Sequence, residues 1–152
     1  MKTLLFAILL GFFGLSYAVD ATTANPHGSS PHGSVMSTVD LGDINVGKAP
    51  GQNAYTVAEV VDQASALKDK PVVVRAKVVK FSPEIMSKNW IHLRDGSGSV
   101  ANKNNDLVVT SKDQAKVGSV VIVKGIVRTN KDFGHGYSYS VLIEDASVKA
   151  QQ

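Results

Sequence analysis

The chain has 152 residues and a mass of 16.1 kDa, enough for one domain with appended segments and too little for two ordinary domains. Hydrophobic residues make up 43% and charged residues 19%, which excludes a wholly disordered chain. The net charge of +3 is a small excess spread along the sequence, so charge alone defines no partner. The absence of cysteine excludes thiol catalysis, disulfides, thiolate metal sites and CxxCH haem attachment.

Residues 1–18 have the pattern of a secretory signal peptide. Lys2 supplies a positive start, residues 4–15 form an apolar run, and Ser16-Tyr17-Ala18 is a cleavage site of the small-x-small type. The apolar run is shorter than the roughly 20 residues needed to span a bilayer. We therefore expect cleavage after Ala18, a periplasmic location for the mature protein, and no stable membrane insertion after cleavage.

Residues 19–54 predict a flexible leader because they are rich in small and polar residues and show no sustained period of 2 or 3.6. The sequence Pro-His-Gly-Ser occurs twice in this segment and places His27 and His32 five residues apart. Two imidazoles at this spacing can share a metal ion, as in some His-rich tracts. A low-complexity linker with incidental histidines explains the same composition.

A short helix is predicted after the leader. Thr56 and Glu59 have the spacing of a capping box, in which each side chain accepts a hydrogen bond from the other residue's backbone N–H. The helix should begin at Val57 and end before Pro71, since the residue preceding a proline is disfavoured in helical conformation. Its apolar stripe consists of Val57, Val60, Val61, Ala64 and Leu67.

Five strands are predicted in the remainder of the chain. Their ranges are 72–81, 89–94, 107–110, 119–129 and 137–144, followed by a terminal tail over 145–152. In the first strand Arg75 and Lys77 alternate with apolar residues and should face away from them. Gly125 lies inside the fourth strand, where a glycine indicates a bulge or a sharp bend.

Three segments resemble OB-fold nucleic-acid-binding domains: Val72–Val79, Trp90–Gly98 and Val117–Val127, with their turn glycines and alternating valines. With the Thr56–Glu59 box ahead of them, they are similar to small exported bacterial OB proteins. The resemblance covers residues 56–148. It implies an all-β fold over 55–149, a five-stranded OB-type Greek-key barrel with an N-terminal helix packed on it, and a binding face on the second and third strands.

The chain departs from this family pattern in two places. Ala76 stands where the family commonly has glycine, and residues 100–105 include Asn-Lys-Asn-Asn in place of part of a strand. We therefore expect an irregular connection between the second and third strands.

Basic and aromatic residues alternate along the strands and loops that would form the binding face. The ligand-binding candidates are Arg75, Lys77, Lys88, Trp90, His92, Arg94, Lys103, Phe133, Tyr137 and Tyr139. Such interleaving suits single-stranded nucleic acid, which is bound through stacking and phosphate contacts. Alternation places Trp90, His92 and Arg94 on one face of the second strand. Trp90 is interpreted either as an exposed stacking residue or as packing over the end of the barrel.

The loop over 133–139 combines two glycines with three aromatic residues. In an OB domain it would join the last two strands and form a rim of the binding face. His135 and Tyr139 have the H-x-x-x-Y spacing of exported OB-type haem chaperones, but in that family the motif follows the last strand. The metal candidates are His27, His32 and His135.

No G-x-S-x-G elbow and no glycine-rich phosphate loop occurs in the sequence, so we predict no enzyme activity and no cofactor. The sequence favours a non-catalytic periplasmic OB-fold binding or adaptor protein. Its expected partner is an anionic polymer, nucleic acid included, a peptide or another envelope component. The alternative is a periplasmic metal or haem handling protein that uses the histidines of the leader and the 130–139 loop.

Overall fold

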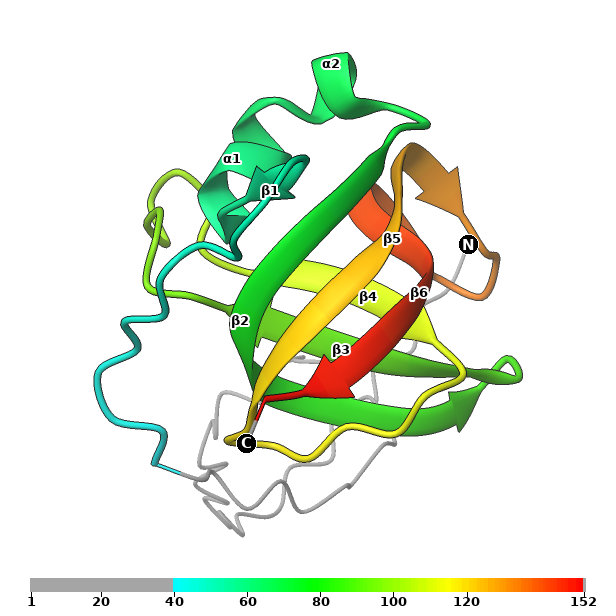
Figure 1. The fold of residues 1–152 in the computed structure, drawn as a ribbon. Coiled ribbons are helices and arrows are strands. Elements are labelled where there is room, and N and C mark those ends of the chain that lie inside the picture. The colour runs from blue at the N-terminus through cyan, green and yellow to red at the C-terminus, as the bar shows by residue number, and fades with distance from the viewer. Residues whose placement is uncertain (1–39, 152) are drawn as a thin grey trace, which may run out of the picture. The chain divides into compact units, whose positions relative to one another are not determined.

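The computed structural model describes residues 40–151, and they form a mostly β fold with two short helices (Figure 1). The elements in chain order are β1 (Ala54–Tyr55), α1 (Val57–Asp62), α2 (Ala64–Leu67), β2 (Pro71–Ile85), β3 (Lys88–Arg94), β4 (Leu107–Ser111), β5 (Val120–Asp132) and β6 (Ser138–Ala150). All five predicted strands are present. The structure adds β1, whose two residues are too short for a recognisable sequence pattern.

The strands form one mixed sheet in the order β1-β2-β3-β4-β6-β5, and β2 also pairs with β5. A ring of hydrogen bonds therefore passes through the last five strands. Between β4 and β6 the pairing is parallel and has only two register pairs, Val109 with Ile143 and Ser111 with Ala146, separated by a shift. The architecture is accordingly a six-stranded sheet with a ring of pairings, not a true barrel.

The core lies inside this ring because apolar residues alternate along each strand. In β2 the four residues Val72, Val74, Ala76 and Val78 are buried, whereas Arg75 and Lys77 between them are partly exposed, as predicted. Inward residues of the other strands complete the same cluster, including Ile91, Leu93, Leu107, Val109, Val123, Val127 and Ile143. The strand residues that alternate with these core residues point outward and form the surface of the ring.

The predicted helix is present but broken at Gln63. The capping box forms as expected, with Thr56 Oγ1 accepting from Glu59 N at 3.1 Å and Glu59 Oε2 accepting from Thr56 N at 2.8 Å. The chain then turns so that Leu67 enters the core, and Asp69 N donates to Val127 O at 2.9 Å. These contacts with β5 fix the direction of α2, which periodicity alone could not indicate.

The prediction of a flexible leader over residues 19–54 was wrong for residues 40–53, which pack on the folded domain. Residues 40–53 contain no helix or strand, yet Val46 and Ala49 are buried, and Val46 N donates to Asp95 O at 2.8 Å. A Cβ on Gly96, whose φ is +92°, would lie 2.0 Å from Ile44 O, so the segment packs tightly on the turn after β3. The sequence did not indicate this packing, because two isolated buried residues produce no helical or strand periodicity. The signal peptide and residues 19–39 lie outside the described residues.

The predicted terminal tail was also wrong, because β6 continues to Ala150 and pairs with β5. The register between them shifts at Gly125, where this one residue faces Asp145 and Ala146, so a bulge is present but its extra residue lies on β6 and not on the strand in which it was predicted. A Cβ on Gly125 would lie 2.5 Å from Ile143 Cγ2 and 2.9 Å from Ala146 Cβ, so only glycine fits there. The extra residue on β6 interrupts the alternation of apolar and polar residues along this strand. The sequence pattern therefore ended the predicted strand at residue 144.

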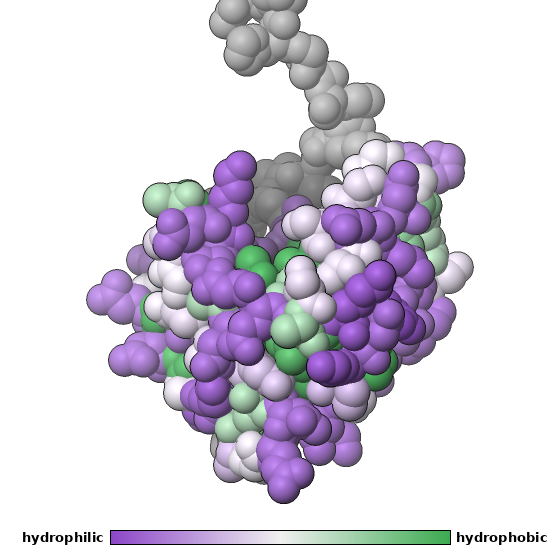
Figure 2. Space-filling model, turned by 90° about the horizontal axis from the view of Figure 1, so that it is seen from above, coloured by the Kyte–Doolittle hydropathy of each residue, from purple (hydrophilic) through white to green (hydrophobic). Residues whose placement is uncertain are grey.

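Seen from above, at the end that carries α2 in Figure 1, the surface is largely hydrophilic with small, separate apolar areas (Figure 2). Small separate apolar areas are normal on a soluble domain and mark no interface by themselves.

Candidate functional site

Four aromatic rings meet on the outer side of β3. The ring of Trp90 lies at centroid distances of 5.0 Å from Phe133, 5.4 Å from Tyr137 and 5.3 Å from Tyr139. Trp90 is only 3% exposed, and its Nε1–H donates to Ile85 O at 2.9 Å. We call Phe133, Tyr137 and Tyr139, which are half-buried, together with the Trp90 beneath them, the aromatic surface.

The interpretation of Trp90 as an exposed stacking residue is therefore wrong. Its indole packs with Val108 and Leu142 in a second hydrophobic cluster outside the ring. The predicted alternation was correct, since Ile91 and Leu93 are in the main core while Trp90 is on the opposite side of β3. What the sequence did not indicate is that the β5–β6 hairpin folds over this side and covers the indole.

Local chain geometry holds the hairpin in place. Gly134 and Gly136 have φ values of +78° and +85°, which side chains with a Cβ rarely adopt. Asp132 Oδ1 accepts from Gly134 N at 2.8 Å, and this hydrogen bond, followed by one from Ser138, lowers the pKa of Asp132. Phe133 N donates to Tyr137 O at 2.9 Å. The rings are thus fixed by the turn and by the packing on Trp90.

Tyr139 has a raised pKa because its side chain is partly desolvated, with a further contribution from Tyr137. Its hydroxyl therefore remains protonated at neutral pH and can donate a hydrogen bond. A shallow pocket of about 320 Å³ on the β5–β6 hairpin is lined by Asn130, Lys131, Asp132, Ser138, Tyr139 and Ser140. Ser138 and Ser140 flank Tyr139 in β6, so alternation turns their hydroxyls to the face opposite the tyrosine side chain.

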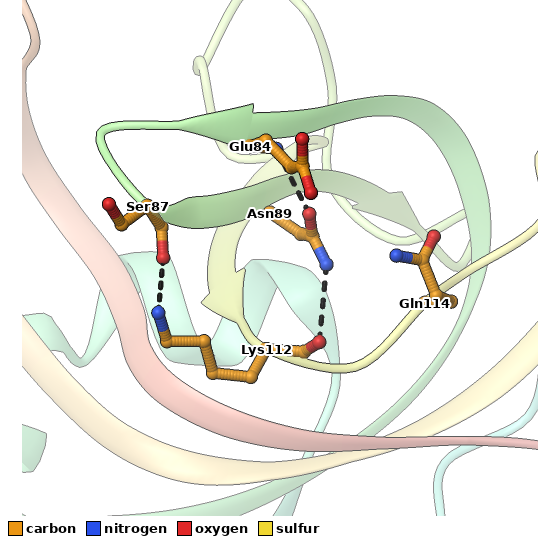
Figure 3. Close-up of a pocket in the computed structure, with 5 residues that line it drawn as sticks. All are labelled: Glu84, Ser87, Asn89, Lys112 and Gln114. Atoms are coloured by element: carbon orange, nitrogen blue, oxygen red, sulfur yellow. Dashed lines mark hydrogen bonds between the residues drawn. The ribbon is translucent and has the colours of Figure 1, made fainter.

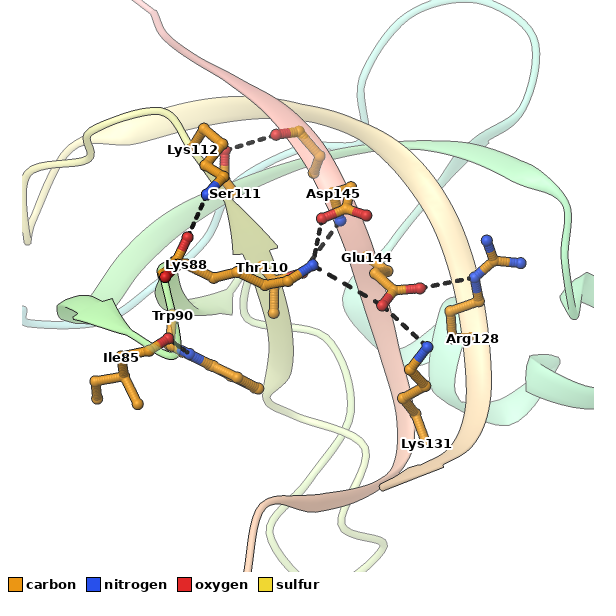
Figure 4. A network of polar contacts seen from close by, with 12 residues as sticks. Ile85, Lys88, Trp90, Thr110, Ser111, Lys112, Arg128, Lys131, Glu144 and Asp145 are labelled. Carbon is orange, nitrogen blue, oxygen red and sulfur yellow. Dashed lines mark hydrogen bonds and ion pairs between the residues drawn. The ribbon is translucent and has the colours of Figure 1, made fainter. Parts of the chain in front are cut away.

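An ion-pair network lies next to the aromatic surface and joins β3, β5 and β6 (Figure 4). The Glu144 carboxylate, in a residue 9% exposed, lies 3.0 Å from Arg128 Nε and 3.2 Å from Lys131 Nζ. Lys88 Nζ lies 2.5 Å from Asp145 Oδ1, and Arg128 also pairs with Asp69 at 2.6 Å. The basic and acidic groups here largely neutralise one another.

A second, smaller set of charges lies at the other end of β3. His92 Nδ1 is 2.7 Å from Asp106 Oδ1, and Arg94 Nε donates to Asp106 Oδ2 at 2.9 Å. Burial alone would raise the pKa of Asp106, but the hydrogen bond from His92 and then that from Arg94 outweigh it, so the pKa lies below its ordinary value. His92 and Arg94 are thus engaged by a carboxylate and are less available to an anionic ligand.

A polar pocket of about 470 Å³ lies between the β2–β3 turn and the loop after β4, lined by Glu84, Ser87, Asn89, Lys112 and Gln114 (Figure 3). Asn89 accepts from Glu84 N at 3.1 Å and donates to Lys112 O and Asp113 O at 3.3 and 2.9 Å. Lys112 Nζ donates to Ser87 O. The chain itself thus uses most of the pocket's hydrogen-bonding groups, which makes it a structural junction.

The structure divides the ten ligand-binding candidates among several places. Trp90, Phe133, Tyr137 and Tyr139 come together, with Lys88 in the adjacent ion-pair network. Arg75 and Lys77 lie instead on the outer side of β2, where Arg75 donates to Gly47 O at 3.2 Å and Lys77 to Leu41 O at 3.2 Å. Lys103 lies on the exposed loop before β4, away from the rings.

Sequence reasoning missed Glu144, Asp106 and Lys131, which determine the charge balance around the rings. No local pattern could have identified Glu144, because it follows the apolar run of β6 as an ordinary strand-end acid and becomes buried only through the pairing of β6 with β5.

Of the metal candidates, His135 is exposed at the hairpin tip, and His27 and His32 lie outside the described residues. Within residues 40–151 no group of three or more His, Cys, Asp or Glu side chains is arranged to hold a metal ion. Among those same residues, no helix has the length and apolar character needed to cross a membrane.

Comparison of the chain with protein-family models, with curated proteins and with solved structures found no match.

Proposed function

We propose that the protein is a non-catalytic OB-type binding protein of the periplasm that acts as an adaptor and engages a peptide segment of an envelope partner through the aromatic surface. The ring of strand pairings with a hairpin over β3 is the arrangement expected of an OB domain, whose loops and adjacent strand face bind ligands. The expected signal peptide supports the location.

The proposal depends on one observation: the buried ring of Trp90 packs against three half-buried aromatic rings. Trp90 fixes Phe133, Tyr137 and Tyr139 with centroid distances of 5.0–5.4 Å, so a ligand would meet a surface that is already ordered. Ordering before binding reduces the entropy lost on association. Aromatic residues with adjacent hydrogen-bonding groups are typical of the energetically important parts of protein interfaces.

The charges around the rings favour a peptide over an anionic polymer at this place. Lys88, Arg128 and Lys131 each pair with a carboxylate, and the last two share Glu144. A polyanion would have to compete with these carboxylates. A peptide without excess negative charge need not compete with them and can stack an apolar or aromatic side chain on the half-buried Tyr139.

A selection of random peptides displayed on phage, followed by titration of the selected peptides, tests the proposal. Trp90 is the only tryptophan, so its fluorescence reports binding at the rings it contacts. We expect Tyr139→Ala to weaken binding by more than about 1 kcal/mol, as for an aromatic residue that contributes substantially to a protein interface. The matched control Tyr139→Phe keeps the ring and should retain most of the affinity. Selected peptides whose affinity is unchanged in Tyr139→Ala and that leave the fluorescence unaffected would contradict the proposal.

A further inference from the structure

Four basic residues lie together on the outer side of β2, β5 and β6, the side away from the aromatic surface. We call Arg75, Lys77, Lys124 and Lys149 the basic face. The strand registers place Arg75 opposite Ile122 and Ile122 opposite Lys149, so these three residues form one row across the strands. The next row contains Val73, Lys124 and Ser147. Alternation turns Val74, Val123 and Val148 of the intervening row into the core.

None of these four cations has a carboxylate partner among the described residues. Arg75 donates to Gln151 Oε1 and Gly47 O, and Lys77 donates to Leu41 O, all of them neutral acceptors. Lys124 and Lys149 make no side-chain hydrogen bond or ion pair within residues 40–151, and both are exposed. In contrast, Lys88, Arg94, Arg128 and Lys131 are each ion-paired elsewhere on the outer surface.

The fold thus separates charge that the sequence distributes evenly. The outer surface around β3 and the β5–β6 hairpin is nearly neutral, whereas the four cations of the basic face form no ion pair with a described acid, although Asp113 accepts from Val148 N at 2.7 Å beside Lys149. Unpaired charges of one sign gathered on a surface attract ligands of the opposite sign, and the attraction weakens with added salt.

A pocket of about 210 Å³ opens on the basic face between the two free lysines. It is lined by Ile122, Lys124, Ser147, Lys149, Ala150 and Gln151. Lys124, Ser147 and Lys149 therefore border the same space, and Gln151, which also borders it, accepts from Arg75. Lysine is a common partner of phosphate, and a phosphate group offers several oxygens that accept hydrogen bonds at once.

We propose that the basic face is a second binding site, independent of the aromatic surface, and that it takes a linear polymer of phosphate groups. Neighbouring strands are about 4.8 Å apart, so Arg75 and Lys149, two strands apart, span about 10 Å, more than one phosphate covers. The outward residues of the three strands in these rows include no aromatic ring, so the polymer is held by charge and not by stacking.

Titration of the full chain with fluorescently labelled inorganic polyphosphate at salt concentrations between 50 and 200 mM tests this site. The logarithm of the binding constant should fall linearly with the logarithm of the salt concentration. The double variant Lys124→Gln/Lys149→Gln should weaken binding at least about tenfold and reduce the slope by about 1.4, which corresponds to two lost contacts with a single-stranded polymer. Both side chains are exposed, and an unchanged melting temperature would confirm that the variant folds.

The control variant Lys68→Gln/Lys103→Gln removes the same two charges from exposed positions outside the basic face and should change the binding constant less than twofold. Equal losses in both double variants, or an unchanged slope in Lys124→Gln/Lys149→Gln, would overturn the proposal, since binding would then follow net charge alone or another surface.

Two further probes distinguish the source of the phosphate. Oligothymidylate should bind with a similar salt dependence, because its backbone presents the same kind of group. Binding of oligothymidylate without binding of polyphosphate would overturn the proposal, since the bases would then be required. Equal binding of polyglutamate would also overturn it and would identify a carboxylate-rich partner. Tyr139→Ala should leave polyphosphate binding unchanged, which separates this site from the aromatic surface.

Discussion

Replacing Trp90 by alanine should destabilise the fold strongly, because the indole is a packing element. Trp90 is 3% exposed, contacts three rings at 5.0–5.4 Å and donates a hydrogen bond to Ile85 O. Truncation of a large buried aromatic costs about 3 to 5 kcal/mol. Small domains have free energies of unfolding of roughly 5 to 15 kcal/mol, so the variant should lose a large share of its stability.

Trp90→Phe separates the two contributions of the indole. It keeps an aromatic ring in contact with Tyr137 and Tyr139 but removes the Nε1–H, so Ile85 O loses its partner. One hydrogen bond contributes about 0.5 to 1.5 kcal/mol, and the smaller ring leaves part of the space unfilled. We therefore expect a loss of roughly 1.5 to 3 kcal/mol, clearly smaller than that of Trp90→Ala.

Urea unfolding followed by circular dichroism is the appropriate assay, since both variants lack the fluorescent indole. The midpoint should fall while the dependence on urea stays constant, as expected for a two-state change in stability. A loss below about 1 kcal/mol for Trp90→Ala would refute the reasoning. It would mean that the hairpin with Phe133 and Tyr137 separates from β3 at little cost and that the aromatic surface is not preformed.

Two other predictions concern the N-terminal segment and the charges at the end of β3. A chain starting at Asn53 should be less stable than one starting at Asp40 by roughly 2 to 4 kcal/mol, because it loses the buried Val46 and its hydrogen bond to Asp95. Urea unfolding of both chains measures this difference. Equal midpoints would show that residues 40–52 do not stabilise the fold. Because the pKa of Asp106 is lowered, the stability that this residue contributes is present above the ordinary value of 3.8 and is lost as the pH falls through the lower folded-state pKa. Asp106→Asn should therefore flatten the acid side of the stability profile, while Asp43→Asn on the exposed segment should leave the profile as in the wild type.

Local sequence patterns predicted the elements well where the structure depends on neighbouring residues. The alternation in β2 correctly assigned Val74 to the core and Arg75 to the surface, and the spacing of Thr56 and Glu59 located the helix start. Gly125 predicted the bulge, because only a residue without a Cβ permits the close approach of Ile143. Each of these features follows from periodicity or from the steric properties of one residue.

The features of the candidate sites depend on residues far apart in the chain. Trp90 is buried only because the hairpin that carries Tyr139 folds over it, 49 positions later, and Glu144 is buried only by the pairing of β6 with β5. The sequence therefore predicted correctly that Trp90 lies on the outer face of β3, but it did not predict which aromatic rings on that face are exposed.

Sequence patterns were sufficient to locate five of the six strands that the structure describes, to assign the faces of β2 and β3, and to give the modest net charge of +3. Where that charge lies depends on the folded arrangement. Carboxylates of β6 and of the loops pair with the cations near β3 and the β5–β6 hairpin, and none of those described forms an ion pair with Lys124 or Lys149. Pairing of charges is a matter of distance in space, so a sum along the chain could not reveal the basic face.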